Sequence, residues 1–361
     1  MGFSICVFDG DGIGPEIMAP TLRILDRAVA QAGGPNLTFS HHPAGAGHYA
    51  ETGEALPKAS VDAARASDAI LLSAMGLPSI RKPDGTEITP QIELRFALNL
   101  YAGVRPVRVF PGQKTVLSDP RAADIDFVLV RESTEGLFAH MNDGVVTQTD
   151  ATEVMRITRA TSEKLFDFSF RLTQHRASRK GRRGRLTCVD KANVFRAFWF
   201  FREIFEARAQ QYPDVQTDAA YVDAMAMWFV QRPWEFDVMV TENMFGDILS
   251  DLGAGLLGSL GLAPSADIGD DIAVFQPCHG SAPDIAGQGK ANPLAMILSG
   301  AMMLDWLGTE RQAPTLTVAG QAIDDAVAKV IADGAFLTGD LGGSASTSGC
   351  ADAVLSALGP G

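Results

Sequence analysis

The chain has 361 residues, of which 46% are hydrophobic and 20% are charged, as in folded globular proteins and unlike disordered ones. A net charge of −13 at pH 7 argues against nucleic acid and anionic membranes as partners. At this length the chain can form two domains.

The four cysteines, Cys6, Cys188, Cys278 and Cys350, lie far apart and show no C-x-x-C spacing. This pattern fits a reduced cytoplasmic protein better than a disulfide or zinc framework. The first residues lead directly into an apolar strand without a basic region, which argues against a signal peptide. The longest apolar stretches, 69–75 and 294–304, are too short or too interrupted to cross a bilayer.

The N-terminal segment is predicted to be a buried strand at 5–8, a glycine-rich turn at 9–16 and an amphipathic helix to about residue 32. Gly10 and Gly12 are followed by Pro15 where the dinucleotide fingerprint G-x-G-x-x-G has its third glycine, so the Rossmann fingerprint is not met. Pro15 suits the first turn of a helix. A simple strand-to-helix turn explains the segment as well as a ligand-binding loop does.

Further elements alternate along the chain. Strands are expected at 69–73, 104–110, 127–130, 185–189, 236–240 and 272–275, with helices near 57–66, 152–177, 193–210 and 293–307. This alternation predicts an α/β fold with helices covering a largely parallel sheet. Residues 139–151 are polar and predict a hairpin or protruding arm. The basic run 176–185 follows a helix and is interpreted as a solvated loop, without the aromatic residues of a nucleic-acid site.

Two carboxylates follow the strand at 236–240. Thr241 or Asn243 can cap a helix on which Asp247 and Asp251 stand four residues apart on one face. Like charges at this spacing destabilise a helix unless a cation lies between them, and such oxygen ligands suit Mg²⁺ or Mn²⁺. The alternative is a solvated acidic helix face.

Three arginines precede turns, at Arg95, Arg105 and Arg131. Each alone is most simply an ordinary ion pair. Together with Lys191, Asp223 and the carboxylate pair they supply what a metal-chelated hydroxy acid needs. Arginine binds carboxylates bidentately, and a lysine with a depressed pKa can act as base or acid.

Nine motifs in order carry a resemblance that covers almost the whole chain: 10–16, 98–106, 130–136, 189–194, 222–225, 241–252, 277–287, 291–293 and 338–343. On these motifs the chain resembles the β-decarboxylating dehydrogenases, the family of 3-isopropylmalate, isocitrate, homoisocitrate, tartrate and D-malate dehydrogenases. Nine ordered motifs are far more specific than any one of them.

The resemblance implies a fold of two α/β domains that is distinct from the Rossmann fold. A terminal, NAD-binding domain would comprise residues 1–100 and 258–361. A central domain, 101–257, would carry the arm and the dimer interface. The active sites would lie in the cleft between the domains of a homodimer and combine residues of both subunits.

The resemblance also implies the roles of the site residues. Arg95, Arg105 and Arg131 would bind the substrate. Asp247 and Asp251 of one subunit and Asp223 of the other would ligate Mg²⁺ or Mn²⁺. Lys191 and Asp223 would be the catalytic residues, reaching in from the second subunit.

The implied NAD-binding residues are Asn193, His279, Gly280, Ser281, Ala282, Asp284, Ile285 and Asn292. Asp284 stands at the position that discriminates between the cofactors in this family. A carboxylate there can accept hydrogen bonds from the ribose 2′- and 3′-hydroxyls and would repel a 2′-phosphate, so NAD is expected rather than NADP.

Two departures from the family pattern concern the substrate. Phe138 occupies the place of a tyrosine that delivers a proton to the enolate in most members. If residues 138–140 are extended, His140 lies on the same side and could replace it; a surface histidine, with bulk water as the donor, is the alternative. Thr89 and Gln91 stand where isopropylmalate enzymes place leucines, so the pocket is expected to be partly polar.

The expected function is therefore NAD- and metal-dependent oxidative decarboxylation of a malate-type 2-hydroxy dicarboxylic acid with a substituent at C3, whose identity stays open. The alternative is a non-catalytic or regulatory ligand-binding subunit of the same family, which Phe138 suggests. The full set of arginines, Lys191 and the three aspartates opposes that alternative.

Overall fold

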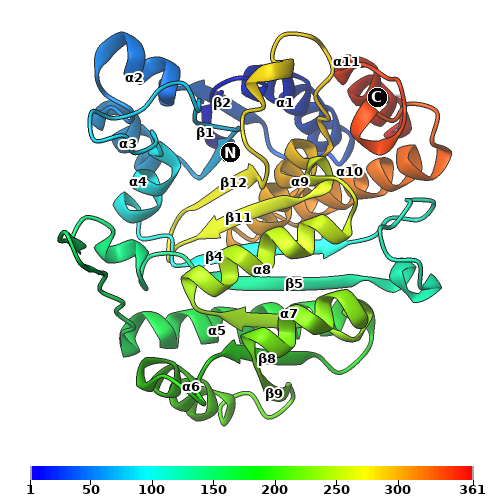
Figure 1. Cartoon of the computed structure of the whole chain (residues 1–361). Coiled ribbons are helices and arrows are strands. Elements are labelled where there is room, and N and C mark those ends of the chain that lie inside the picture. The colour runs from blue at the N-terminus through cyan, green and yellow to red at the C-terminus, as the bar shows by residue number, and fades with distance from the viewer. Residues whose placement is uncertain (1, 360–361) are drawn as a thin grey trace.

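A ten-stranded sheet forms the centre of the protein in the computed structural model, which describes residues 2–359 (Figure 1). The strands run in the order β2-β1-β3-β12-β11-β4-β5-β10-β8-β9. Their bounds are β1 Phe3–Phe8, β2 Leu37–His41, β3 Ala69–Leu72, β4 Ala102–Arg108, β5 Asp126–Glu132, β8 Arg185–Asp190, β9 Gln216–Tyr221, β10 Val238–Thr241, β11 Pro264–Ile268 and β12 Ala273–Pro277.

Six pairings in the sheet are parallel. The three antiparallel pairings join β12, β11, β4 and β5 in the middle of the sheet. A Rossmann sheet is built from parallel β-α-β halves, so this order confirms the predicted α/β fold and its distinction from the Rossmann type. The pairing of β11 with β4 also connects the strands near the chain ends with those of the middle of the chain.

The helices cover both halves of this sheet. Their bounds are α1 Gly14–Gln31, α2 Ala46–Thr52, α3 Lys58–Ala66, α4 Pro90–Ala97, α5 Arg159–Lys180, α6 Arg196–Ala209, α7 Val222–Gln231, α8 Asn243–Leu256, α9 Leu294–Glu310, α10 Pro314–Asp333 and α11 Thr347–Ala357. The helices α1, α9, α10 and α11 pack on one another beside the strands of the two chain ends. The helices α5 and α6 pack together in the other half, and α8 lies on β5.

The expected elements were found, with several bounds shifted. Pro15 stands in the first turn of α1 as predicted. The helix expected from residue 152 begins only at Arg159, because Thr158 caps it by accepting a hydrogen bond from the Thr161 backbone N–H. The division of the chain at residues 101 and 257 into two domains stays a prediction, since one sheet runs through both parts.

The predicted cap of α8 was wrong. Glu242 is the N-cap, and its carboxylate accepts hydrogen bonds from the backbone N–H groups of Met244 (3.1 Å) and Phe245 (3.4 Å). Thr241 belongs to β10, and Asn243 is already helical. Asn243 can therefore use its side chain elsewhere.

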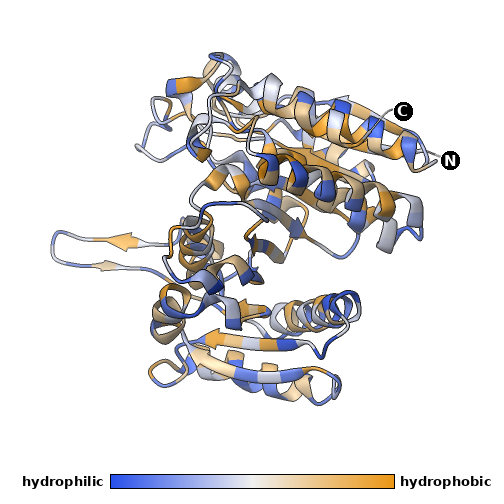
Figure 2. Cartoon of the chain, turned by 90° about the vertical axis from the view of Figure 1, so that its right-hand side faces the viewer, coloured by the Kyte–Doolittle hydropathy of each residue, from blue (hydrophilic) through white to orange (hydrophobic). Residues whose placement is uncertain are grey.

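The arm predicted at 139–151 is confirmed as a hairpin. The short strands β6 (Val145–Val146) and β7 (Ala151–Thr152) pair antiparallel with each other and with no strand of the large sheet. Figure 2 shows the arm extending away from the rest of the chain. Its two valines are exposed, Val146 by 80%.

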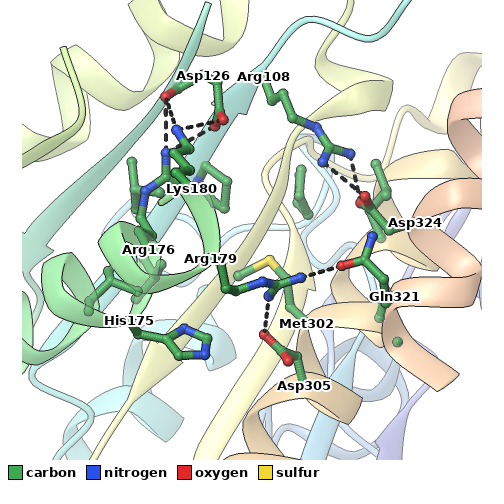
Figure 3. A pocket seen from close by; sticks show the side chains of 18 of the residues that line it. Arg108, Asp126, His175, Arg176, Arg179, Lys180, Met302, Asp305, Gln321 and Asp324 are labelled. Atoms are coloured by element: carbon green, nitrogen blue, oxygen red, sulfur yellow. Dashed lines mark hydrogen bonds and ion pairs between the residues drawn. The ribbon is translucent and has the colours of Figure 1, made fainter. Parts of the chain in front are cut away.

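The interpretation of the basic run 176–185 as a solvated loop was wrong. The helix α5 continues to Lys180, and Arg176 binds both Asp126 (3.0 Å) and the buried Asp237 (3.2 Å). Lys180 binds the other oxygen of Asp126 at 2.7 Å (Figure 3). Carboxylates buried beside strand ends need counter-charges, and this run supplies them.

A cavity of about 360 Å³ lies between β4, α5, α9 and α10 (Figure 3). Arg179 of α5 crosses it to Asp305 of α9 at 3.2 Å and also donates to Gln321 of α10. Arg108 of β4 binds Asp324 of α10 through two hydrogen bonds of 2.9 and 2.7 Å. These charges satisfy one another, so the cavity lining fastens helices of the two halves together.

Within residues 2–359, no helix is both long enough and apolar enough to cross a membrane.

The glycine-rich turn packs against the loop that follows β12. The Ile13 backbone N–H donates to the Ser281 carbonyl at 2.8 Å. Gly12 has a φ of +57°, and a Cβ there would lie 2.1 Å from the same carbonyl oxygen. Asp11 fixes the turn by accepting hydrogen bonds from three backbone N–H groups, those of Ala46, Gly47 and Gly76. The glycine-rich turn therefore supports the loop that follows β12 through direct packing, and does not only connect β1 to α1.

We predict that Gly12→Ala destabilises the protein more than Gly33→Ala, as measured by urea unfolding. Gly33 also has a positive φ, +64°, but a Cβ there meets nothing within 4 Å. Gly33→Ala should cost about 1–2 kcal/mol for the left-handed backbone alone. Gly12→Ala should cost about 1–3 kcal/mol more, because the loop at Ser281 must move. Equal decreases in the free energy of unfolding of the two variants would contradict the close packing of Gly12 against Ser281.

Candidate active site

The three predicted arginines come together although three different elements carry them. Arg95 lies on α4, Arg105 on β4 and Arg131 on β5, and they are only 6%, 8% and 2% exposed. Burial, followed by the charge of Arg95, lowers the pKa of Arg131 to about 10, with Arg105 adding to the effect. Buried cations in such proximity require anions nearby.

Asp267 on β11 is one of these anions, and the sequence analysis missed it. Its carboxylate receives hydrogen bonds from Arg95 (3.3 Å), Gln276 (2.7 Å) and Ser133 (3.3 Å). Burial raises the pKa of Asp267, but the three arginines outweigh burial and hold it below its usual value. The signal for Asp267 in the sequence was an acidic residue within a short stretch of small and apolar residues.

Gly103 makes room for this cluster. It lies on β4 between Arg131 of β5 and Asp267 of β11, which are its partners in the neighbouring strands. A Cβ at Gly103 would stand 2.8 Å from the Arg131 side chain and 3.2 Å from the Asp267 carboxylate. Gly246 plays the same part between α8 and β5, since a Cβ there would lie 2.2 Å from the Arg131 Cβ. Both glycines therefore permit oppositely charged groups to approach.

The carboxylate pair on α8 borders the arginine cluster. Arg131 forms an ion pair with Asp247 and donates a 2.6 Å hydrogen bond to the Asn243 side chain. Burial and the negative charge of Asp247 raise the pKa of Asp251, and Arg105 and Arg131 partly offset both effects. The pair thus faces the arginines, although the Asp247 side chain is also 53% exposed.

Lys191 and Asp223 form a second group. Lys191 follows β8, Asp223 lies in the first turn of α7, and their charged atoms are 2.6 Å apart. The hydrogen bond from Lys191 holds the pKa of Asp223 below its usual value. Asp190 fixes the turn before Lys191, because Arg202 binds it with two hydrogen bonds of 2.7 and 2.8 Å.

The single chain does not bring Asp223 to the carboxylate pair on α8. No group of three or more His, Cys, Asp or Glu residues within residues 2–359 is arranged to hold a metal ion. The resemblance assigned Asp223 and Lys191 to the site of the second subunit, so the predicted set of Asp223, Asp247 and Asp251 stays a prediction.

The predicted cofactor residues at 279–285 form a loop after β12. Ala282 adopts the left-handed conformation, with a φ of 37° and a ψ of 61°. Ala282 and Asp284 are exposed, whereas Ser281 is buried against the glycine-rich turn. His279 Nδ1 lies 2.9 Å from the Gly280 carbonyl, while its buried Nε2 has no hydrogen-bond partner among the described residues. Burial also lowers the pKa of His279.

Asn292 lies near this loop and is held by Asp340, which the sequence analysis left unassigned within the motif 338–343. Asp340 accepts hydrogen bonds from Asn292 (2.9 Å), Thr338 (2.5 Å) and Ser259. Asn193, by contrast, is exposed beside Lys191, and no hydrogen bond within the described chain joins it to the loop at 279–285.

Gln91 lies in the first turn of α4, about one turn before Arg95, and Thr89 directly precedes the helix. The side-chain oxygen of Gln91 is buried and has no hydrogen-bond partner among the described residues. Thr89 is the N-cap of α4, but its side chain makes no capping hydrogen bond. The Gln91 oxygen therefore lacks the partner that a buried polar atom usually has.

The extended geometry that would place His140 beside Phe138 is not found. Residues Phe138–His140 form a 3₁₀ turn, in which side chains two residues apart point in different directions. His140 instead lies 2.6 Å from Asp143. The Phe138 ring packs against Arg131, whose guanidinium carbon is 5.6 Å from the ring centre. Phe138 is therefore part of the arginine cluster's lining.

A buried arginine cluster at the centre of a mostly parallel sheet, bordered by carboxylates, defines an α/β protein with a charged site that suits a small anionic ligand. The sequence matches the isocitrate/isopropylmalate dehydrogenase family over residues 4–354. It is 41% identical over 355 residues to the 3-isopropylmalate/3-methylmalate dehydrogenase of Methanocaldococcus jannaschii, with 97% of each chain covered. It is also 41% identical over 362 residues to the 3-isopropylmalate dehydrogenase of Nitratidesulfovibrio vulgaris, with 94% of each covered.

Among solved structures, the isocitrate dehydrogenase of Methylococcus capsulatus is similar with a TM-score of 0.82 and 37% identity, covering 99% of both chains. The chain therefore belongs to the isocitrate/isopropylmalate dehydrogenase family, as the nine motifs predicted. It is an oxidoreductase of the kind that oxidises and decarboxylates malate-type acids. The alternative of a non-catalytic subunit is accordingly set aside.

Proposed function

We propose that this enzyme uses NAD and Mg²⁺ or Mn²⁺ to oxidise and decarboxylate a 2-hydroxy dicarboxylic acid of the malate type with a small or polar substituent at C3. The proposal includes a homodimer with shared active sites, the two domains divided at residues 101 and 257, and a cytoplasmic location. The observation that supports this proposal most directly is that Arg105 is buried and has no counter-ion among the described residues.

Arg105 is a buried cation without a counter-ion. Arg95 pairs with Asp267 and Arg131 pairs with Asp247, but no carboxylate of the described chain lies within ion-pair distance of Arg105. Its only hydrogen-bond partner among those residues is the Cys278 sulfur, and its Nε has none. An unpaired buried charge is costly, so a ligand carboxylate that binds Arg105 gains the energy of that pairing. The substrate is therefore an anion.

Asp247 and Asp251 fit a divalent cation. They face one another on α8, and the raised pKa of Asp251 reflects burial and a repulsion that a cation would relieve. A cation bound there would acidify the substrate's 2-hydroxyl group and stabilise the negative charge that forms as CO₂ leaves. Arg131 holds Asp247 in position for that binding.

The loop at 279–285 fits the adenosine half of NAD. The exposed carboxylate of Asp284 can accept hydrogen bonds from two ribose hydroxyls, and the unpaired Nε2 of His279 offers a further polar contact. Bound NAD would accept the hydride that leaves C2 of the substrate. The rigid packing of Ser281 on the glycine-rich turn would keep this loop in place.

Lys191 and Asp223 would complete the site of the second subunit. In its neutral form, Lys191 Nζ could take the proton of the substrate's 2-hydroxyl, and Asp223 orients Lys191 through their 2.6 Å contact. A dimer is supported by exposed apolar side chains on the adjacent helices α7 and α8, namely Met227, Val230 and Ile248, and by the exposed valines of the arm. Apolar surface of this kind is usually covered by a partner.

The Gln91 side chain indicates which substituent at C3 is preferred. Its buried, unpaired oxygen would gain a hydrogen bond from a hydroxyl group and would stay unpaired beside an alkyl group. We infer that a polar or small substituent is preferred to the branched isopropyl group.

The metal requirement is tested by removal and by mutation. Turnover should be lost after EDTA treatment and return with Mn²⁺. Asp247→Asn should lower kcat by orders of magnitude and weaken Mn²⁺ binding in calorimetry, with an unchanged circular dichroism spectrum. Asp62→Asn is the control, because it removes a similarly exposed carboxylate from α3. Full turnover of the EDTA-treated enzyme would refute the metal assignment.

The cofactor preference is tested by comparing kcat/KM for NAD⁺ and NADP⁺. We expect at least a tenfold preference for NAD⁺, because facing a phosphate with an uncompensated carboxylate costs more than the roughly 1.4 kcal/mol that a factor of ten requires. Asp284→Asn should reduce the preference, whereas Glu310→Gln, on the exposed end of α9, should not change it. Equal values for the two cofactors in the parent enzyme would contradict the role of Asp284.

The substrate class is tested with a panel of D-malate, tartrate, isocitrate and 3-isopropylmalate, measuring NADH and CO₂ formation. We expect that 3-isopropylmalate is not clearly the best substrate, since an unpaired buried amide costs about 1–3 kcal/mol. Gln91→Leu should raise kcat/KM for 3-isopropylmalate relative to tartrate by roughly 5- to 100-fold. A parent enzyme that strongly prefers 3-isopropylmalate would overturn this inference.

A further inference from the structure

Cys278 differs from the other cysteines of the chain. All four thiols are free, but Cys6, Cys188 and Cys350 are buried, and Cys278 is partly exposed. Burial raises the pKa of Cys6 and of Cys350 to about 12, and that of Cys188 well above its usual value. Those three thiols are therefore unreactive, since the thiolate is the reactive form.

The Cys278 sulfur has two defined contacts. It donates to the Pro264 carbonyl at 3.6 Å and accepts a hydrogen bond from Arg105 Nη1 at 3.1 Å. Its neighbour in the chain is His279, the first residue of the predicted cofactor loop. The sulfur thus contacts a proposed substrate-binding group, and its residue directly precedes the proposed cofactor loop in the chain.

Cys278 lies beside a cation that has no ion pair of its own within the described chain. Arg105 is 8% exposed and has no ion pair among the described residues, so its positive charge acts on the sulfur without being neutralised by a carboxylate in contact with it. The Asp267 carboxylate also attracts Arg105, but Arg95 and Gln276 already bind that carboxylate. A cation beside a partly exposed thiol marks a cysteine susceptible to oxidation.

We propose that Cys278 is a site of reversible oxidation by peroxides, and that the oxidised sulfur takes up Arg105 in competition with the substrate carboxylate. The second part rests on the proposed function of Arg105. An S–O⁻ or S–OH group is larger than a thiol and accepts stronger hydrogen bonds from a guanidinium group. Oxidation therefore weakens substrate binding.

Hydrogen peroxide is the oxidant and supplies the oxygen atom that the sulfur gains. The thiolate sulfur attacks one peroxide oxygen, an S–O bond forms, the O–O bond breaks, and hydroxide leaves and is protonated to water. The sulfur loses two electrons and the peroxide gains them. A dithiol reverses the step: one thiol displaces water from the sulfenic acid to form a mixed disulfide, and the second thiol releases the Cys278 thiol.

The site of oxidation is tested on the full enzyme with hydrogen peroxide in the presence of dimedone, followed by peptide mass spectrometry. Cys278 should carry the label, and Cys6, Cys188 and Cys350 should not. Labelling of Cys278 in the Arg105→Gln variant should be at least about fivefold slower than in the parent, because the cation beside the sulfur is gone. Absence of the label from Cys278, or equal rates in Arg105→Gln, overturns the proposal.

The consequence for substrate binding is tested by kinetics with the best acid of the panel. Peroxide should raise KM for the acid more than it lowers kcat, and dithiothreitol should reverse the change. Cys278→Ser, compared with its own untreated activity, should be insensitive, whereas Cys350→Ser should remain as sensitive as the parent. Loss of activity in treated Cys278→Ser at the parental rate, or a labelled Cys278 with unchanged KM, overturns the competition for Arg105.

These measurements separate the two proposals. Labelling of Cys278 requires no turnover and no assumption about the substrate. The role of Arg105 in substrate binding is measured separately, as a rise in KM for Arg105→Lys without peroxide. An unchanged KM in Arg105→Lys therefore refutes the proposed function of Arg105, whatever the labelling shows.

Discussion

Three guanidinium groups share one buried region at the centre of the sheet, and this accumulation of charge constrains the structure around it. Burial of cations is expensive unless carboxylates or hydrogen-bond acceptors accompany them. Asp267 and Asp247 neutralise Arg95 and Arg131, and Gly103 and Gly246 supply the space for that contact. Arg105 keeps a positive charge that no residue of the described chain pairs. An anion placed beside Arg105 would therefore be stabilised.

The antiparallel strands β11 and β4 determine where this point lies. They join the strands of the two chain ends to those of the middle segment, so the cluster draws Asp267 and Arg95 from one half and Arg105 and Arg131 from the other. Two ion pairs in the cavity lining join the halves: Arg179 connects α5 to α9, and Arg108 connects β4 to α10. A site assembled across such a junction is held by the whole sheet rather than by one loop.

Three uncharged residues accompany the arginine cluster. Gln91 has a buried side-chain oxygen without a partner among the described residues, Phe138 packs against Arg131, and Cys278 is the hydrogen-bond partner of Arg105. Each touches or approaches the arginine cluster without replacing a charged member of it. The cluster therefore combines charged groups with uncharged neighbours that the proposed substrate would also meet.

The sequence by itself determined the fold class, the family and the candidate arginines and carboxylates, because ordered motifs, periodicity and the spacing of Asp247 and Asp251 are local properties of the chain. It did not reveal Asp267, whose importance comes from strands that are adjacent only in the sheet, nor Glu242 as the cap of α8. The ion pairs of the basic run were likewise invisible, since Asp126 and Asp237 lie more than forty residues away along the chain. Only the tertiary structure decided which charges meet, because burial makes each charge depend on partners that the sequence leaves far apart.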